Sequence, residues 1–324
     1  MKKIISGFLS VLFIVGGCWA QTVGSNSSVE AVKIEAQPKR GFSYPYYLYV
    51  PPALRDPQKR KQTHTLLVIP NNTGEISDDL SVHEAKVKKN MKNLNLFLAS
   101  KLGVAVLMPV FPRPATDWQL YTHALDRDSM LTDKKDYHRF DLQLVAMIDD
   151  ARGKLKSEKL KTDKRVLING YSASGMFANR FTFLHPKRVK AAAIGSPGGW
   201  AIAPVNSHKE KTLRYPIGTG DFKLVAGKSF DNKNLRKVPL FIFLGDKDTN
   251  DSVVFGDGYD AEDKDLVFEI FGKTPVERWE TSKSLYRENE LTATFKLYSN
   301  IGHTVTDEMI KDILEFFSKY VNQE

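Results

Sequence analysis

The stretch that decides the fold is Val166-Leu-Ile-Asn-Gly-Tyr-Ser-Ala-Ser-Gly175. It begins with a short apolar run typical of a buried strand, and residues 175–184 then follow the period of a helix. Between the two lies Ser172, in a connection so short that only small residues fit beside it. Gly170 lies two positions before this serine, and Ser174 lies two positions after it. The stretch therefore predicts a strand, a tight turn at Ser172, and a helix.

Apolar runs and helix-period segments alternate along the rest of the chain. The apolar runs are residues 65–69, 104–110, 165–168, 189–194, 239–244 and 294–298. The helical segments are residues 82–101, 140–155, 175–184, 275–290 and 306–320. Uninterrupted apolar runs are typical of strands buried on both faces of a parallel sheet. The alternation predicts one α/β domain over residues 42–324, a single doubly wound, mostly parallel sheet with an aromatic-rich outer strand within residues 42–50.

Two segments, residues 200–237 and 248–273, interrupt this alternation. Both are rich in glycine, aspartate and lysine, and both are too long to be plain connections. In open α/β sheets, ligands bind beyond the carboxyl ends of the strands. We therefore expect the two segments to be lid-like insertions beside a binding site at that edge.

The turn at Ser172 resembles the nucleophile elbow of the α/β-hydrolase superfamily, whose pattern is G-x-S-x-G between a strand and a helix. Ser174 replaces the second glycine of that pattern, although Gly175 follows directly. Serine before a helix is also an ordinary cap, so the motif alone has a plainer reading. Two later segments strengthen the resemblance, because they follow Ser172 in the same order along the chain as the acid and the histidine of the family.

The first of these is the strand end Gly245-Asp246-Lys247-Asp248, where the family's acid maps onto Asp248; Asp246 and Asp251 are alternatives. The second is His303, which follows a glycine in the loop before the last helix, where the family has its general base. The order serine, acid, histidine matches that of the superfamily. Taken singly, each residue has a simpler explanation. The aspartate could be a turn residue, and the histidine could be a helix cap or an exposed side chain.

The series Asp246, Asp248 and Asn250 also resembles the start of a calcium loop. The sixth position of such a loop requires glycine, where this chain has Asp251, and a strand rather than a helix precedes the series. These departures count against calcium, and we predict neither a metal nor an organic cofactor.

The resemblance further implies an oxyanion hole made of two backbone N–H groups. One belongs to Ala173, the residue after the serine. The other comes from the loop Pro70-Asn-Asn-Thr-Gly74, with Asn72 or Thr73 as the donor. Many exported esterases have His-Gly at the start of this loop, where this chain has Pro70-Asn71, so the particular donor stays open.

A substrate pocket is expected around the same loop. Its candidate lining residues are Thr73, Trp118, Tyr121, His123 and Tyr171. Together with Arg127, Tyr121 and His123 could bind an anionic or sugar-bearing acyl group. The alternative is that these three side chains belong to a surface salt-bridge network.

The N-terminus predicts export. Lys2 and Lys3 precede an apolar run over residues 4–17, which is shorter than the roughly 20 residues of a membrane-spanning helix. A basic start followed by a short apolar run is typical of a secretion signal, here residues 1–20. We expect a periplasmic or secreted protein whose residues 21–41 form a flexible leader.

The end of the signal has two readings. Cys18 and Ala20 fit the small-residue positions before a cut at Gln21, whereas Val-Gly-Gly-Cys over residues 15–18 resembles a lipobox. In the second reading Cys18 is lipidated and attaches the protein to a membrane. Because Cys18 is the only cysteine in the chain, neither a disulfide within the mature domain nor thiol catalysis is expected.

Composition excludes several classes of protein. The 324 residues are 42% hydrophobic and 26% charged, which is ordinary for a globular protein and excludes disordered, collagen-like and coiled-coil chains. The formal net charge is +9, but the positive residues are scattered. No helix carries a basic stripe with interleaved aromatic residues, so nucleic acid is not an expected partner.

The layout of residues 42–320 resembles exported esterases related to polyhydroxybutyrate depolymerases and feruloyl esterases. This resemblance implies a serine hydrolase that cleaves a small-molecule or polymeric ester through an acyl-enzyme on Ser172. One alternative is a serine peptidase of the prolyl-oligopeptidase type, which usually carries a large extra domain that this sequence does not show. Another is a catalytically silent binding protein, because fold alone does not prove activity. The acyl group, the alcohol and the oligomeric state are not indicated.

Overall fold

The computed structural model describes residues 31–72, 74–91 and 96–321. The predicted signal over residues 1–20, with Cys18, lies outside the described residues, and so does the pocket candidate Thr73. In the part of the chain that is described, no helix is both long and apolar enough to cross a membrane.

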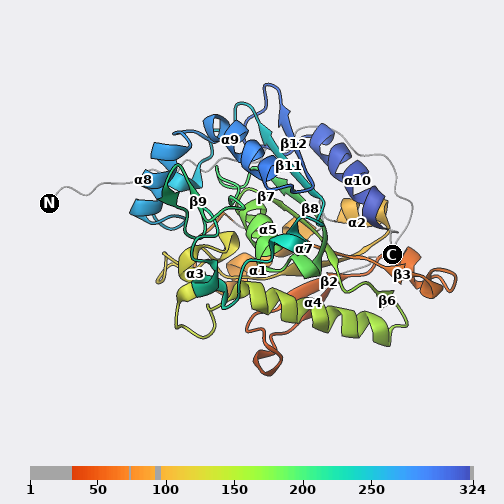
Figure 1. The fold of residues 1–324 in the computed structure, drawn as a ribbon. Coiled ribbons are helices and arrows are strands. Elements are labelled where there is room, and N and C mark those ends of the chain that lie inside the picture. The colour runs from red at the N-terminus through yellow and green to blue at the C-terminus, as the bar shows by residue number, and fades with distance from the viewer. Residues whose placement is uncertain (1–30, 73, 92–95, 322–324) are drawn as a thin grey trace.

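An eight-stranded sheet forms the centre of the molecule, in the order β1-β2-β5-β4-β7-β8-β11-β12 (Figure 1). Its strands are β1 (Val32–Ile34), β2 (Tyr46–Tyr49), β4 (Leu66–Val68), β5 (Ala105–Pro109), β7 (Val166–Tyr171), β8 (Val189–Gly195), β11 (Leu240–Gly245) and β12 (Ala293–Tyr298). The six strands from β5 to β12 in this order are parallel, whereas β1 and β2 are antiparallel to their neighbours. This is the mostly parallel sheet that the sequence predicts.

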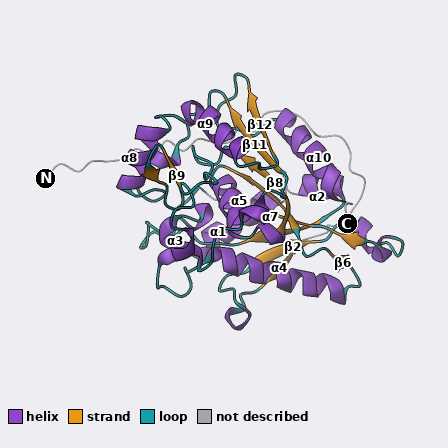
Figure 2. Cartoon of the chain, viewed as in Figure 1, coloured by secondary structure: helices purple, strands orange, loops and turns teal. Residues whose placement is uncertain are grey.

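Helices cover both faces of the sheet, as Figure 2 shows. They are α1 (Leu80–Asn90), α2 (Leu96–Leu102), α3 (Arg127–Leu131), α4 (Phe140–Ser157), α5 (Ala173–Leu184), α6 (Phe222–Ala226), α7 (Asn232–Leu235), α8 (Ala261–Ile270), α9 (Pro275–Glu288) and α10 (Asp307–Val321). Residues of α1, α2 and α10 pack on one face, and residues of α4, α5 and α9 pack on the other. The fold is therefore doubly wound.

Consecutive strand residues contribute to opposite faces of the sheet. In β4, Val68 packs with the α4 and α5 side, while its neighbour Leu67 packs with the α1 and α10 side, and both are fully buried. Side chains alternate across a strand, so a strand covered on both faces needs apolar residues throughout. This requirement explains why the strands are continuous apolar runs in the sequence.

The two insertions pack together above the elbow. Residues 200–237 include the short strands β9 (Ser207–His208) and β10 (Lys211–Thr212), and residues 248–273 include α8. A third apolar cluster joins Trp200, Leu213 and Tyr259 of the insertions to Ala173 and Met176 at the start of α5. The insertions are thus a packed layer beside Ser172. Outside the main sheet, β3 (Thr63–His64) pairs with β6 (Lys161–Thr162).

One prediction differs from the structure. Residues 32–34, which we expected in a flexible leader, form β1, an edge strand paired with β2. A three-residue edge strand with one buried side chain, Ile34, has too short a pattern to be recognised in a sequence. Helices α1 and α2 lie within the helix predicted over residues 82–101 or overlap its ends, and residues 92–95 between them lie outside the described residues.

Candidate active site

Ser172 lies where β7 ends and α5 begins. Its backbone angles, φ 61° and ψ −127°, are unfavourable for a residue with a side chain. The Ser172 N–H donates to the carbonyl of Gly195, at the end of the neighbouring strand β8, over 3.0 Å. This hydrogen bond to β8 stabilises the strained turn at Ser172.

Two glycines make this turn possible. A Cβ at Gly170 would lie 2.0 Å from the carbonyl oxygen of Ser174, and a Cβ at Gly175 would lie 2.3 Å from the carbonyl oxygen of Gly195. Helix α5 therefore touches the backbone of β7 and β8 directly. Ser174, the departure from the family pattern, accepts from the Tyr171 N–H and donates to the Tyr171 carbonyl. Its hydroxyl closes the turn instead of facing substrate.

Ser172, His303 and Asp248 form a continuous chain of hydrogen bonds. Nε2 of His303 lies 2.9 Å from Oγ of Ser172, and Nδ1 lies 2.9 Å from Oδ2 of Asp248. An ionised carboxylate only accepts, so Nδ1 carries the proton and Nε2 accepts from the serine hydroxyl. These are the three residues that sequence reasoning singled out, and the structure brings them together from three strand ends.

The Asp248 carboxylate is buried but well supplied with donors. Besides His303, the Ser196 hydroxyl donates to Oδ2 over 2.7 Å, and the Asn250 N–H donates to Oδ1 over 2.9 Å. Burial raises the pKa of Asp248, but the bonds from His303, Ser196 and Asn250 outweigh it and leave the pKa below its ordinary value. The side chain is therefore ionised at neutral pH and can stabilise a protonated imidazole.

The two alternative acids are placed elsewhere. Asp251 forms a buried, two-pronged ion pair with Arg278, with N–O distances of 2.9 and 2.8 Å. Among the described residues Asp246 makes no bond to His303, and its Oδ1 is buried without a hydrogen-bond partner. In the same part of the chain, no group of three or more histidine, cysteine, aspartate or glutamate side chains is arranged to hold a metal ion.

The predicted oxyanion donors flank the serine. Ala173 is the first residue of α5, where a backbone N–H has no partner within the helix. The Asn72 side chain lies 3.5 Å from the carbonyl of Tyr171, so its loop meets the elbow. The neighbouring Asn71 is buried, and its amide pairs with both backbone groups of Phe111 at the end of β5. Asn71 therefore fixes the start of this loop.

The pocket candidates separate into different environments. Trp118 is about half exposed, and the Tyr121 ring is buried beneath Arg113. His123 is fully buried, 2.7 Å from the carbonyl of Phe111, and burial lowers its pKa to about 3. His123 is therefore a neutral core residue next to Asn71, and it cannot bind an anionic acyl group as proposed above. Arg127 pairs with Asp221, and both side chains are mostly buried, so this pair is not the surface network considered above.

Tyr171, the fifth pocket candidate, faces the histidine. Its ring centre lies 5.0 Å from that of His303, and its hydroxyl donates to the carbonyl of Thr304 over 3.0 Å. The tyrosine thus holds the loop that carries His303. Its side chain also contacts the Phe243 ring in β11 and the Ser196 side chain, so Tyr171 links three strand ends of the candidate site.

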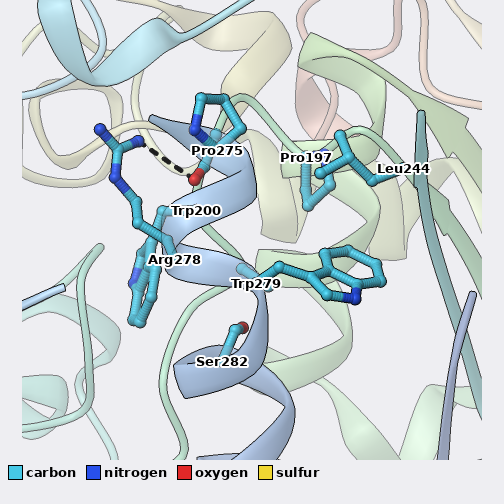
Figure 3. Close-up of a pocket in the computed structure, with 9 residues that line it drawn as sticks. Pro197, Trp200, Leu244, Pro275, Arg278, Trp279 and Ser282 are labelled. Atoms are coloured by element: carbon cyan, nitrogen blue, oxygen red, sulfur yellow. Dashed lines mark hydrogen bonds between the residues drawn. The ribbon is translucent and has the colours of Figure 1, made fainter. Parts of the chain in front are cut away.

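A small cavity lies beneath the loop that follows β8. Its volume is about 20 Å³, the size of one water molecule. Figure 3 shows Trp200 and Trp279 beside it, and the dashed line marks the bond from Arg278 to the carbonyl of Gly199. Ser172 does not line this cavity, which is also too small for an acyl group.

Sequence reasoning missed three residues that support the site: Ser196, Asn71 and Arg278. Each is buried, and each forms a hydrogen bond with a residue more than 25 positions away in the chain. No local motif marks them. The only signal is position, because Ser196 follows β8 directly and Asn71 lies three residues after the end of β4, at the edge where the site was expected.

Comparison with known proteins supports the fold. No protein-family model matches the chain, and no curated protein sequence matches it either. Among solved structures it is similar to poly(aspartic acid) hydrolase-1 from Sphingomonas sp. KT-1, with a TM-score of 0.56, 17% identity and coverage of 90% of this chain and 98% of that one.

Two further structures are similar. The poly(3-hydroxybutyrate) depolymerase LpqC from Bordetella parapertussis has a TM-score of 0.53 and 13% identity, over 91% of this chain and 92% of that one. An S-formylglutathione hydrolase from Agrobacterium tumefaciens has a TM-score of 0.51 and 14% identity, over 92% and 99%. These are proteins of the α/β-hydrolase superfamily, and the chain described above has their fold.

Proposed function

We propose that the chain is a serine hydrolase that cleaves carboxylic esters through an acyl-enzyme. The observation that carries this proposal is the hydrogen-bonded series Ser172, His303 and Asp248 at a strained strand-to-helix turn. The names of the structurally similar proteins, a poly(3-hydroxybutyrate) depolymerase and an S-formylglutathione hydrolase among them, favour a hydrolase of this kind. Fold alone would not, because one fold serves many activities.

The proposed reaction has two halves. Oγ of Ser172 attacks the ester carbonyl while Nε2 of His303 takes the hydroxyl proton, and Asp248 stabilises the imidazolium that forms. The N–H groups of Ala173 and Asn72 hold the negative oxygen. His303 then returns the proton to the leaving alcohol. In the second half, water attacks the acyl-enzyme with the same proton transfers, which releases the acid and restores Ser172.

The proposal includes export and needs no cofactor. The basic and apolar start of the chain supports a cleaved signal. The mature protein is lipid-anchored if Cys18 is lipidated, and free of an anchor if the signal is cut before Gln21. Mass spectrometry of the protein recovered from the cell envelope of its host distinguishes a start at Gln21 from a lipidated Cys18. The substrate is a small or polymeric ester outside the cytoplasm.

Hydrolysis of p-nitrophenyl esters, from acetate to long acyl chains, tests the activity. We expect turnover by the mature protein and loss of more than about 1,000-fold in kcat for Ser172→Ala. The matched control is Ser174→Ala, which removes the neighbouring hydroxyl that closes the turn. This variant keeps Ser172 and is therefore expected to hydrolyse the ester. Turnover of no ester, with turnover of peptides, would favour the peptidase; no reaction with a fluorophosphonate would favour a binding protein.

A further inference from the structure

The orientation of the Asp248 carboxylate depends on groups from several parts of the chain. The terminal torsion of an aspartate has a broad preference, so neighbours decide which way the two oxygens point. Oδ1 accepts from the Asn250 N–H two residues along the same loop. Oδ2 accepts from Ser196, which follows β8, and faces Nδ1 of His303. Ser196 is the anchor of this carboxylate that comes from the rigid sheet.

Ser196 is held in an unusual backbone conformation. Its φ is 41°, in the left-handed region that favours glycine, and the residue is 2% exposed. The Ser196 N–H donates to the carbonyl of Phe243 in β11 over 2.8 Å. At this φ glycine would be less strained than serine, so the side chain is held there at a cost. Its hydroxyl donates to the carboxylate of Asp248 and also has a hydrogen-bond contact with the Tyr171 side chain.

The same strand end also supports the nucleophile. Gly195, the residue before Ser196, accepts from the Ser172 N–H, and a Cβ at Gly195 would lie 2.5 Å from the rings of Tyr171 and Phe243. One dipeptide at the end of β8 therefore contacts both the serine turn and the acid. Because β8 lies between β7 and β11, it can set the distance between them.

We propose that Ser196 is a positioning residue, whose hydroxyl fixes the Asp248 carboxylate so that Oδ2 is presented to Nδ1 of His303. This inference rests on the proposed function, since it assigns Ser196 a role in that same reaction. Ser196 donates its own proton to Asp248, and so it does not compete with Ser172 as a nucleophile. Without the hydroxyl, the carboxylate turns about its terminal torsion and the imidazole loses its fixed orientation.

The test compares Ser196→Ala and Ser196→Gly with wild type on the best p-nitrophenyl ester. We expect kcat to fall about tenfold in both variants while KM stays within twofold, because the hydroxyl does not face substrate. The rate of fluorophosphonate labelling falls in parallel with kcat. Alanine keeps the Cβ and the strain that serine already has at φ 41°, whereas Ser196→Gly relieves this strain, so the glycine variant is the safer of the two for folding.

The matched control is Ser129→Ala in α3, which removes another fully buried serine hydroxyl, one that bonds to the carbonyl and the carboxylate of Asp126 and not to Ser172, His303 or Asp248 in the described structure. Its kcat should equal that of wild type. Wild-type kcat in folded Ser196→Gly, or a loss that appears in KM alone, overturns the positioning role and leaves the proposed function intact. A wild-type protein that no fluorophosphonate labels overturns both.

Discussion

At the scale of single residues, Asp248 differs from its neighbour Asp246 in its contact with His303. Replacing Asp248 with asparagine leaves a side chain that can donate to Nδ1 and so favours the wrong tautomer. We expect kcat of Asp248→Asn to fall by about 10³- to 10⁴-fold. Asp246→Asn is the matched control and should keep kcat within a few-fold. Equal losses in the two variants would contradict the assignment of the acid.

His123 makes the stability of the protein depend on pH. Burial lowers its pKa to about 3, so between pH 6.5 and 3 the unfolded chain binds a proton that the folded chain does not. The free energy of unfolding therefore decreases as pH falls, by about 1.4 kcal/mol per unit. Asp126, whose pKa burial raises to about 7, acts in the opposite direction over much of the same range.

A difference between variants separates the two effects. Relative to wild type, the free energy of unfolding of His123→Gln should increase by about 2 kcal/mol between pH 7.5 and pH 5, because only wild type loses stability there through this residue. Urea unfolding at the two pH values measures this change. The exposed His138→Gln is the control, and parallel changes in His123→Gln and wild type would refute the role of burial.

Residues of the candidate site were predictable where a short sequence motif surrounds them. Ser172 and His303 each follow a strand and have glycine at the required spacing, so their motifs can be read without knowledge of the fold. His123 was assigned to the expected pocket together with Trp118 and Tyr121, which lie in the same segment of the sequence. Its burial against Phe111 is a tertiary fact, and the same is true of Ser196. Supporting residues of this kind follow from packing, not from sequence pattern.

At the scale of elements, two helical glycines have opposite requirements. A Cβ at Gly175 in α5 would lie 2.3 Å from a backbone oxygen of β8, whereas a Cβ at Gly153 in α4 meets no atom within 4 Å. We expect Gly175→Ala to decrease the free energy of unfolding by about 3 kcal/mol or more. Gly153→Ala should increase it by about 0.5–1 kcal/mol. Urea unfolding checks both, and a tolerated Gly175→Ala would contradict the close approach of α5.

Long, continuous patterns identified the central strands and the helices, and short or interrupted patterns did not. The strand predicted over residues 239–244 is β11, displaced by one residue. All six residues of β11 are buried, and a strand buried along its whole length has a continuous apolar pattern that is easy to recognise. In contrast, β1 has three residues, of which only Ile34 is buried, and these residues were expected in a flexible leader.

At the scale of the whole molecule, one buried ion pair ties together three parts of the active-site edge. Arg278 projects from α9, pairs with Asp251 in the loop that carries Asp248, and donates to the carbonyl of Gly199 in the loop after β8. Helix α9 also packs against the sheet through Trp279 and Tyr286. The layer of insertions is thereby fixed to the sheet at the place where Asp248 and Ser196 meet.

Breaking that pair should destabilise the whole protein. Arg278→Met leaves the buried Asp251 charge without its partner, and we expect the free energy of unfolding to fall by about 3–5 kcal/mol. Arg278→Met combined with Asp251→Leu removes both charges and should recover most of that loss, since an apolar pair needs no desolvation of ions. The comparison is the exposed pair of Arg236 and Glu290, where Arg236→Met should change stability by less than about 1 kcal/mol. Urea unfolding of these three variants and of wild type measures the changes in the free energy of unfolding. A double variant as unstable as Arg278→Met would show that the geometry around Gly199, and not the unpaired charge, holds the insertions to the sheet.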